Sequence, residues 1–176
     1  PYLLTDLPQQ RNRLFMVAFS IKDFKNGKID FPSQINSSPK KLANYIDFDG
    51  AQDDETYYLP TENRYHKMIN EGAEDKGCIY QLRKFLVREK KPGVCPTLTA
   101  NMGLGGHNVP FIFDAKGLRK LTEYECLWLQ GFPKNFKFPD QVGRAKRYMH
   151  VGNSVSVPIA ELLGERVRDK IFKERL

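Results

Sequence analysis

The hydrophobic pattern is strongest near the two ends of the chain. Residues 14–19 form a continuous apolar run of six, Leu-Phe-Met-Val-Ala-Phe, which is typical of a strand buried on both faces. From about Val157, apolar side chains recur at helical spacings and predict an amphipathic helix, with Pro158 suited to its first turn. The stripe comprises Ile159, Leu162, Leu163, Val167, Lys170 and Ile171.

Between these ends the periodicity is weaker. Residues 22–62 are rich in Pro, Gly, Asn, Asp and Ser and predict loops with short irregular elements. Residues 79–87 fit either a short strand or a helix. Residues 96–100 and 109–113 are predicted to be two strands around the glycine-rich stretch 101–108. That stretch fits a hairpin loop, and it equally fits a segment whose glycines let another backbone approach closely.

A capping box marks the start of one further helix. Thr122 and Glu125 stand in the Thr-x-x-Glu spacing in which each side chain accepts from the other residue's backbone N–H. The helix is expected to run through Gln130, where Gly131 supplies a left-handed stop.

The composition of the 176 residues, 40% hydrophobic and 28% charged, fits a soluble globular protein. No apolar run approaches the ~20 residues of a membrane span, and we expect no secretory signal. Cys78, Cys95 and Cys126 lack close spacing, so neither a disulfide scaffold nor a four-ligand zinc site is expected. A sparse, odd cysteine count favours a reducing cytosol.

Positive charge is concentrated outside one acidic segment. The net charge is +7, but residues 47–75 hold nine acids and two bases, which leaves +14 on the remainder. Such a concentration suggests a polyanionic partner, with nucleic acid first, and basic ribosomal or membrane-surface proteins would look similar. The acidic segment is expected to be a solvated outer face or a subunit contact.

Three ordered segments of the chain stand out as motifs: Gln9-x-Arg11-x-Arg13, residues 119–133 (Arg-Lys-Leu-Thr-x-x-Glu-Cys-x-x-Leu-Gln-Gly-Phe-Pro) and Gly152-Asn153-Ser154-Val155. They resemble the last three conserved blocks, eight to ten, of DNA cytosine-5 methyltransferases. The resemblance implies an α/β fold. Residues 1–21 and 118–176 would be terminal pieces of a Rossmann-like catalytic domain, and residues 22–117 a small, irregular target-recognition domain of strands and loops.

The middle of the chain also resembles one bacterial subgroup, which methylates short G·C-rich restriction sites of the CCGG or CCNGG kind. The matching pieces are residues 79–83 (Ile-Tyr-Gln-Leu-Arg), 87–89 (Val-Arg-Glu) and 95–110 (Cys-Pro-Thr-Leu-Thr-Ala-Asn-Met-Gly-x-Gly-Gly-His-Asn-Val-Pro).

The family's nucleophile and much of its cofactor site have no counterpart in this sequence. The Phe-x-Gly-x-Gly turn for S-adenosylmethionine, the Pro-Cys nucleophile and the Glu-Asn-Val carboxylate are all missing, so a thiolate attack on cytosine cannot be assembled. The resemblance therefore implies the small subunit of a split bacterial, cytoplasmic methyltransferase, or a fragment of a longer chain. Such a chain is expected to be inactive without a large catalytic subunit.

Block eight supplies the expected catalytic group. The family places its arginines beside the flipped cytosine and the DNA backbone. The resemblance implies that Arg13 donates to the cytosine O2 and that Arg11 supports it, with Gln9 in the same group. The alternative is that both arginines are surface or phosphate-contacting residues.

The recognition domain supplies the expected contacts to double-stranded DNA. An arginine can donate bidentately to guanine and a glutamine to adenine, and phosphate contact is the alternative for the same side chains. Residues 97–108 match the second recognition loop, in which Thr97-Leu98 resembles the doublet beside the flipped base. The expected DNA-contacting residues are Gln81, Arg83, Arg88, Thr97, Leu98, Thr99, Asn101, His107 and Asn108.

Blocks nine and ten imply one brace and one cofactor contact. Arg119 is expected to brace the recognition domain by pairing with Glu125 or nearby backbone. Asn153, Ser154 and Val155 are expected to line the S-adenosylmethionine site, shared with the missing catalytic portion, and an Asn-Ser helix cap is the alternative.

Two functions of different classes follow, beside the third possibility that the chain is a remnant of a broken gene. The first is the DNA-recognition subunit of a cytosine-5 methyltransferase in a restriction-modification system. The second is a non-catalytic DNA-binding module or regulator, which would need neither the base-pocket block nor the cofactor-facing block. In the first case the strand at 14–19 would join a sheet completed by the partner, so the isolated chain should expose an apolar interface.

Overall fold

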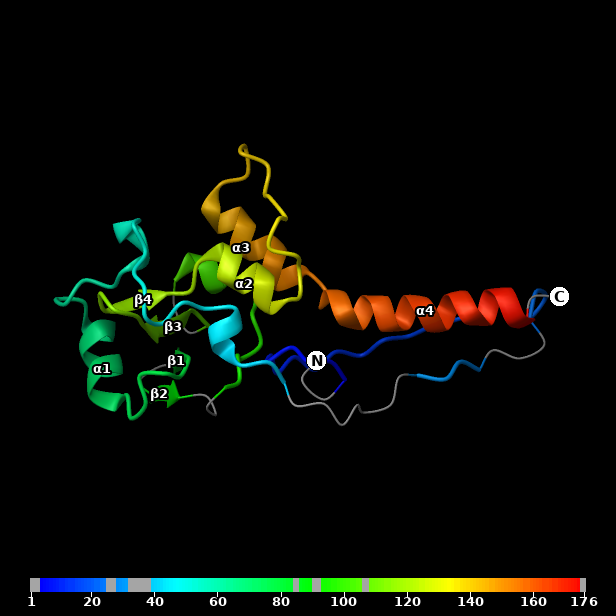
Figure 1. Ribbon diagram of the computed structural model, residues 1–176, viewed down its shortest axis with the longest axis horizontal. Coiled ribbons are helices and arrows are strands. Elements are labelled where there is room, and N and C mark those ends of the chain that lie inside the picture. Colours follow the sequence, from blue (N-terminus) through cyan, green and yellow to red (C-terminus); the bar gives the residue numbers. More distant parts are fainter. Residues whose placement is uncertain are drawn as a thin grey trace.

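The computed structural model describes residues 4–24, 28–31, 39–83, 86–89, 93–105 and 108–174. The molecule is elongated (Figure 1): a body holds a small sheet and several short helices, and the long helix α4 (Val157–Glu174) projects from it. The N-terminal segment leaves the body and extends alongside this helix. None of the described helices is both long and apolar enough to cross a membrane.

Four antiparallel strands form one sheet in the order β2–β1–β3–β4. β1 (Tyr80–Arg83) and β2 (Leu86–Glu89) form a hairpin, so residues 79–87, left open between strand and helix, are mainly strand. β3 (Pro110–Phe113) confirms the strand predicted at 109–113, and it pairs with β1 on one side and β4 (Leu118–Lys120) on the other.

The strand predicted over residues 96–100 is wrong. Residues 96–100 belong to no strand, and the nearest pairing is an isolated parallel bridge between Gln9 and Cys95, the residue before the segment. Two features keep it out of a ladder. Pro96 has no N–H to donate, and the Leu98 carbonyl accepts a hydrogen bond from the Arg11 side chain at 2.6 Å.

The sheet separates two hydrophobic cores because alternate side chains of a strand point to opposite faces. Helix α1 (Arg64–Gly72) contacts β1 and β2, and its buried Ile69 belongs to the core on that side. The other core joins Ile112 of β3 to buried residues of α2 (Glu123–Leu129) and α3 (Arg144–Asn153), two helices that contact each other. The α1 core comprises Ile69, Cys78, Tyr80, Leu82, Val109, Phe111, Phe113 and Leu118.

Helix α2 confirms the predicted capping box. The Glu125 N–H donates to the Thr122 hydroxyl at 3.1 Å, and the Thr122 N–H donates to the Glu125 carboxylate at 2.7 Å. The helix ends at Leu129 with Gln130 as its C-cap, and Gly131 takes the left-handed conformation with φ +87°. The start and the stop of this helix were both readable from local sequence.

Helix α4 confirms the amphipathic helix predicted from Val157. Ile159 and Lys170, two members of the predicted stripe, are buried. Ile171, at its far end, is exposed. The helix is therefore covered along one side.

The fully buried strand predicted at residues 14–19 is wrong. Leu14 is 84% and Met16 88% exposed, whereas Phe15, Val17 and Phe19 are half-buried, and the segment has no strand pairing. This alternation is what an extended chain shows when only one of its sides is covered. Its second side faces solvent.

Residues 22–62 are loops with short 3-10 turns in the part that is described, as predicted; the turns are η1 (Leu42–Asn44) and η2 (Glu55–Tyr57). The acidic segment also has a structural use within the chain. Asp54 forms an ion pair with Arg144 of α3, and Glu55 pairs with Lys116 between β3 and β4. These are exposed ion pairs between the acidic loop and the body, and pairs of this kind contribute little to stability.

Candidate functional site

Backbone hydrogen bonds hold the block-eight segment beside the start of the recognition loop. The Cys95 N–H donates to the Pro8 carbonyl at 2.6 Å, and the Gln10 N–H donates to the Cys95 carbonyl at 2.8 Å. The Thr97 hydroxyl donates to the Gln10 carbonyl at 2.7 Å. This pairing places Gln9-x-Arg11-x-Arg13 directly next to Thr97-Leu98, two groups far apart in the sequence.

The Arg11 guanidinium joins three segments of the chain. It is 6% exposed; Nη1 donates to the Leu98 carbonyl at 2.6 Å, and Nη2 donates to the carbonyls of Gly152 and Ser154 at 2.9 and 2.8 Å. Burial, and to a smaller extent Arg13, lowers the pKa of Arg11 to about 10, so it remains a cation at neutral pH. The sequence carried no sign of these contacts, because the acceptors are backbone carbonyls.

The other two members of the expected catalytic group differ in exposure. Arg13 is exposed and donates only to the adjacent Asn12 carbonyl, at 2.7 Å, among the described residues. Gln9 is fully buried, and neither its amide oxygen nor its amide nitrogen has a hydrogen-bond partner in the described structure. Arg13 is therefore the member of the group that is open to a ligand.

Helix α3 packs backbone to backbone against the recognition loop. A Cβ on Gly152 would lie 2.5 Å from the Thr99 carbonyl oxygen and closer still to the Ala100 nitrogen. A Cβ on Gly103 would lie 2.7 Å from Cβ of Tyr148. Gly103 is thus one of the loop glycines that allow a close approach, as the sequence suggested. Gly152 allows the same close approach from helix α3.

The expected cofactor contacts lie where α3 ends. Ser154 is the C-cap residue of α3, and its hydroxyl donates to the Val151 carbonyl at 2.7 Å. Asn153 and Val155 are exposed, and the buried hydroxyl of Ser156 has no partner among the described residues. Ser154 therefore caps the end of α3, and the exposed side chains of Asn153 and Val155 lie on either side of it.

Several of the expected DNA-contacting residues form one hydrogen-bonded polar group, in which Gln81 is buried, with only 7% of its surface exposed. Gln81 of β1 donates to the Asn108 carbonyl at 3.2 Å, and the side chains of Thr99 and Asn108 donate to Asn101 Oδ1 at 2.7 and 3.4 Å. The exposed Arg88 of β2 stands opposite Gln81, hence on the same face of the sheet.

Leu98 does not contribute to this polar group, because it is buried in the larger core. The side chain of Arg83 and the whole of His107 lie outside the described residues.

The predicted brace between Arg119 and Glu125 is confirmed. Both side chains are buried, and Nη1 and Nη2 of Arg119 each donate to Glu125 at 2.8 Å. Arg119 Nε also donates to Asp114 at 2.6 Å, a partner that sequence reasoning missed. Burial alone would lower the pKa of Arg119, but the hydrogen bonds to Glu125 and Asp114 outweigh it and raise that pKa.

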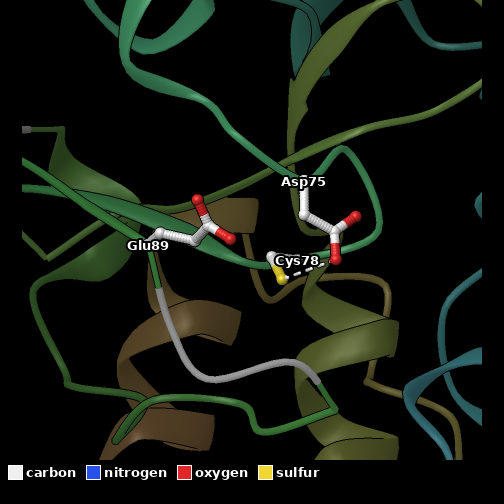
Figure 2. A group of neighbouring side chains, drawn as sticks. All are labelled: Asp75, Cys78 and Glu89. Carbon is white, nitrogen blue, oxygen red and sulfur yellow. Dashed lines mark hydrogen bonds between the residues drawn. The ribbon is translucent and has the colours of Figure 1, made fainter.

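Two carboxylates, Asp75 and Glu89, lie beside the Cys78 thiol at the edge of the sheet (Figure 2). Asp75, the buried Cys78 and Glu89 converge from the loop after α1 and from β2, with their donor atoms within 4.8 Å of one another. The Cys78 thiol donates to Asp75 at 3.5 Å. Burial, followed by hydrogen bonds to Glu89 and Asp75, raises the pKa of this thiol to about 12. A protonated thiol between two carboxylates accounts for the arrangement, and a cation would first have to displace that proton.

Comparison with known sequences extends over nearly the whole chain. The profile of the C-5 cytosine-specific DNA methylase family matches residues 4–169. The chain is 38% identical over 172 residues to the type II methyltransferase M.Bsp6I of Bacillus sp. (strain RFL6), covering 97% of this chain and 52% of that protein. It is 28% identical to the type II methyltransferase M.MspI of Moraxella sp. over 167 residues, or 92% and 35% of the two chains.

Solved structures share the fold. Dnmt2 methyltransferase of S. pombe superposes with a TM-score of 0.57 at 18% identity, covering 96% of this chain and 53% of that one. A Spodoptera frugiperda DNMT2 variant gives a TM-score of 0.58 at 16% identity, covering 98% and 56%.

These matches define a methyltransferase fold in a chain of mixed helices and a small antiparallel sheet. The chain belongs to the C-5 cytosine-specific DNA methylase family. It spans about half the length of M.Bsp6I and about a third of M.MspI.

Proposed function

We propose that this chain is the DNA-recognition part of a type II DNA cytosine-5 methyltransferase. Together with a large catalytic polypeptide, it would methylate C5 of a cytosine in a short, G·C-rich duplex site. The observation that carries the proposal is the meeting of the block-eight arginines, the Thr97-Leu98 segment and the block-ten segment around Arg11. A protein that only read DNA would have no use for that meeting.

Within this assembly, Arg13 would contact the flipped cytosine. Its guanidinium is exposed and uses one donor on its own backbone neighbour, so its remaining N–H groups are available to the cytosine O2. Gln9 and Arg11 lie buried beside it and would support it from within the protein.

The exposed polar residues beside the buried Gln81 would face the major groove. Arg88 is exposed on β2, the edge strand of the sheet, on the same face as Gln81, and its guanidinium carries donors that the base edges in that groove accept. Arg88 would donate to guanine, and the loop residues Thr99, Asn101 and Asn108 would contact neighbouring bases or phosphates.

The end of α3 fits one side of an S-adenosylmethionine site. Asn153 and Val155 are exposed there, and Ser156 holds a buried hydroxyl without a partner among the described residues. S-adenosylmethionine would supply the methyl group when bound. The part of this chain would be to orient it, with Asn153, Ser154 and Val155 as the contacting residues.

The catalytic polypeptide would cover the open side of the N-terminal segment. Leu14, Met16 and Ile21 expose large apolar side chains on this segment, and the chain contains no Pro-Cys nucleophile of its own. An exposed apolar surface on an extended segment is a common docking surface for another chain.

The test is methyl transfer from labelled S-adenosylmethionine to G·C-rich duplex DNA. The chain alone is compared with the chain plus the polypeptide encoded immediately upstream. We expect activity only in the mixture, and its loss on Arg13→Ala. A folded complex that binds DNA without transferring methyl groups would instead indicate a DNA-binding module.

A further inference from the structure

We infer that Arg11 is a positioning residue that couples the DNA-facing loop to the cofactor-facing segment, an inference that rests on the proposed methyltransferase function. In this role Arg11 does not touch the flipped base. It holds the two binding surfaces in one fixed relation, so that the orientation of either depends on the other.

The exposure of Arg11 and the use of its donors separate it from Arg13. Arg11 is 6% exposed, and both of its terminal nitrogens donate to backbone carbonyls at 2.6–2.9 Å. A buried cation with those donors occupied has little left to offer a base. The exposed Arg13, two residues further on, has unused donors.

Two of the three acceptors are carbonyls at the C-terminal end of α3. The last carbonyls of a helix lack intrahelical partners and carry partial negative charge. Arg11 Nη2 donates to the carbonyls of Gly152 and Ser154, so its charge satisfies this helix end and fixes where α3 stops. Asn153, Ser154 and Val155, the residues proposed to meet the cofactor, lie at this same end of the helix.

The third acceptor belongs to the recognition loop. Arg11 Nη1 donates to the Leu98 carbonyl at 2.6 Å, and Thr97 is tied to the same N-terminal segment through the Gln10 carbonyl. Gly152 closes the arrangement, because no Cβ fits between it and the backbone of Thr99 and Ala100. A shift of the loop is therefore transmitted to the end of α3, and the reverse.

This arrangement predicts coupled effects in the variant Arg11→Met, which keeps the aliphatic stem and removes the cation. Charge-assisted hydrogen bonds each change an equilibrium by about tenfold or more. We expect the KM for DNA and the KM for S-adenosylmethionine both to rise about tenfold. Arg11→Lys, with a cation but no planar fork, should recover part of each loss.

The experiment uses the assembled enzyme and adds hydrogen exchange measured on the same complex. Arg11→Met should speed amide exchange in residues 97–104 and also in 150–156, while exchange in α1 stays unchanged. Arg13→Met serves as the comparison. It should lower kcat without changing exchange in either segment or the KM for S-adenosylmethionine.

Each outcome decides one point. Unchanged exchange in both segments of Arg11→Met, or a loss of kcat alone, would overturn the positioning role and favour direct contact with the base. A wild-type complex that assembles but transfers no methyl group would refute the proposed function. The exchange comparison would still decide whether Arg11 holds the loop and the helix end together.

Discussion

Gly152 and Thr99, 53 positions apart, lie in backbone contact: there is no room for a Cβ between the last turn of α3 and the recognition loop. We therefore predict that Gly152→Ala destabilises the chain by about 1–3 kcal/mol, the usual cost of overpacking a closed contact. Urea denaturation followed by circular dichroism measures this free energy of unfolding.

Gly164 provides the matched control for that substitution. It also lies within a helix, but a Cβ there would meet nothing within 4 Å. Gly164→Ala should stabilise the chain by about 0.5–1 kcal/mol, the difference in helix propensity. Equal effects of the two alanines would show that the contact at Thr99 is looser than described.

Local signals in the sequence predicted local structure well. The capping box of Thr122 and Glu125 spans only three residues of chain and was readable from their spacing, whereas the brace between Arg119 and Glu125 followed from the resemblance to block nine. The contacts of Arg11 were not readable, because their acceptors are backbone carbonyls 87 to 143 residues away. Every residue has a backbone carbonyl, so the residue type does not show which carbonyls accept such bonds.

The error at residues 14–19 has a different origin. An apolar run shows that the side chains are suited to burial, but it does not show which chain buries them. Leu14 and Met16 are exposed here, as expected if the second face of this segment is covered by a polypeptide that the sequence does not contain. The apolar pattern and the exposure then describe the same surface.

Glu125→Gln tests the buried brace. Glutamine can preserve the capping box, but it removes the charge that pairs with Arg119 and one of the two oxygens that accept from its guanidinium. Breaking a buried pair on one side costs about 3–5 kcal/mol when the remaining charge is left unpaired. Arg119 keeps its pair with Asp114 at 2.6 Å, so the free energy of unfolding should fall by less, about 1–3 kcal/mol. Glu71→Gln, in the exposed pair with Lys67 at 3.9 Å, should change it by less than about 0.5 kcal/mol.

The buried thiol and phenol near Asp75 predict a loss of stability at high pH. Burial is the main cause that raises the pKa of both Cys78 and Tyr80 to about 12. Unfolded chains lose these protons nearer pH 8.5 and 10. Above about pH 9 the unfolded state therefore binds fewer protons than the folded state, and the free energy of unfolding falls as the pH rises toward 12.

Urea denaturation at a series of pH values from 7.5 to about 11 measures that slope. Cys78→Ala should make the decline shallower, since it removes one of the two groups, even if it lowers stability at every pH. A slope that Cys78→Ala leaves unchanged would mean that the thiol does not titrate with unfolding.

The exposed apolar side chains of the N-terminal segment predict where the catalytic polypeptide binds. Leu14 and Met16 contribute almost nothing to the folded chain itself, because more than four-fifths of each is exposed. Replacing both by serine should leave the melting temperature of the isolated chain unchanged. The dissociation constant for the upstream polypeptide should rise by at least about tenfold, since burying each side chain is worth about 1.5–3 kcal/mol.

Leu104→Ser is the control: it changes an exposed leucine in η3 (Met102–Leu104) and should not weaken assembly. If the double variant assembles as tightly as the natural chain, the catalytic polypeptide docks elsewhere and the apolar segment needs another explanation.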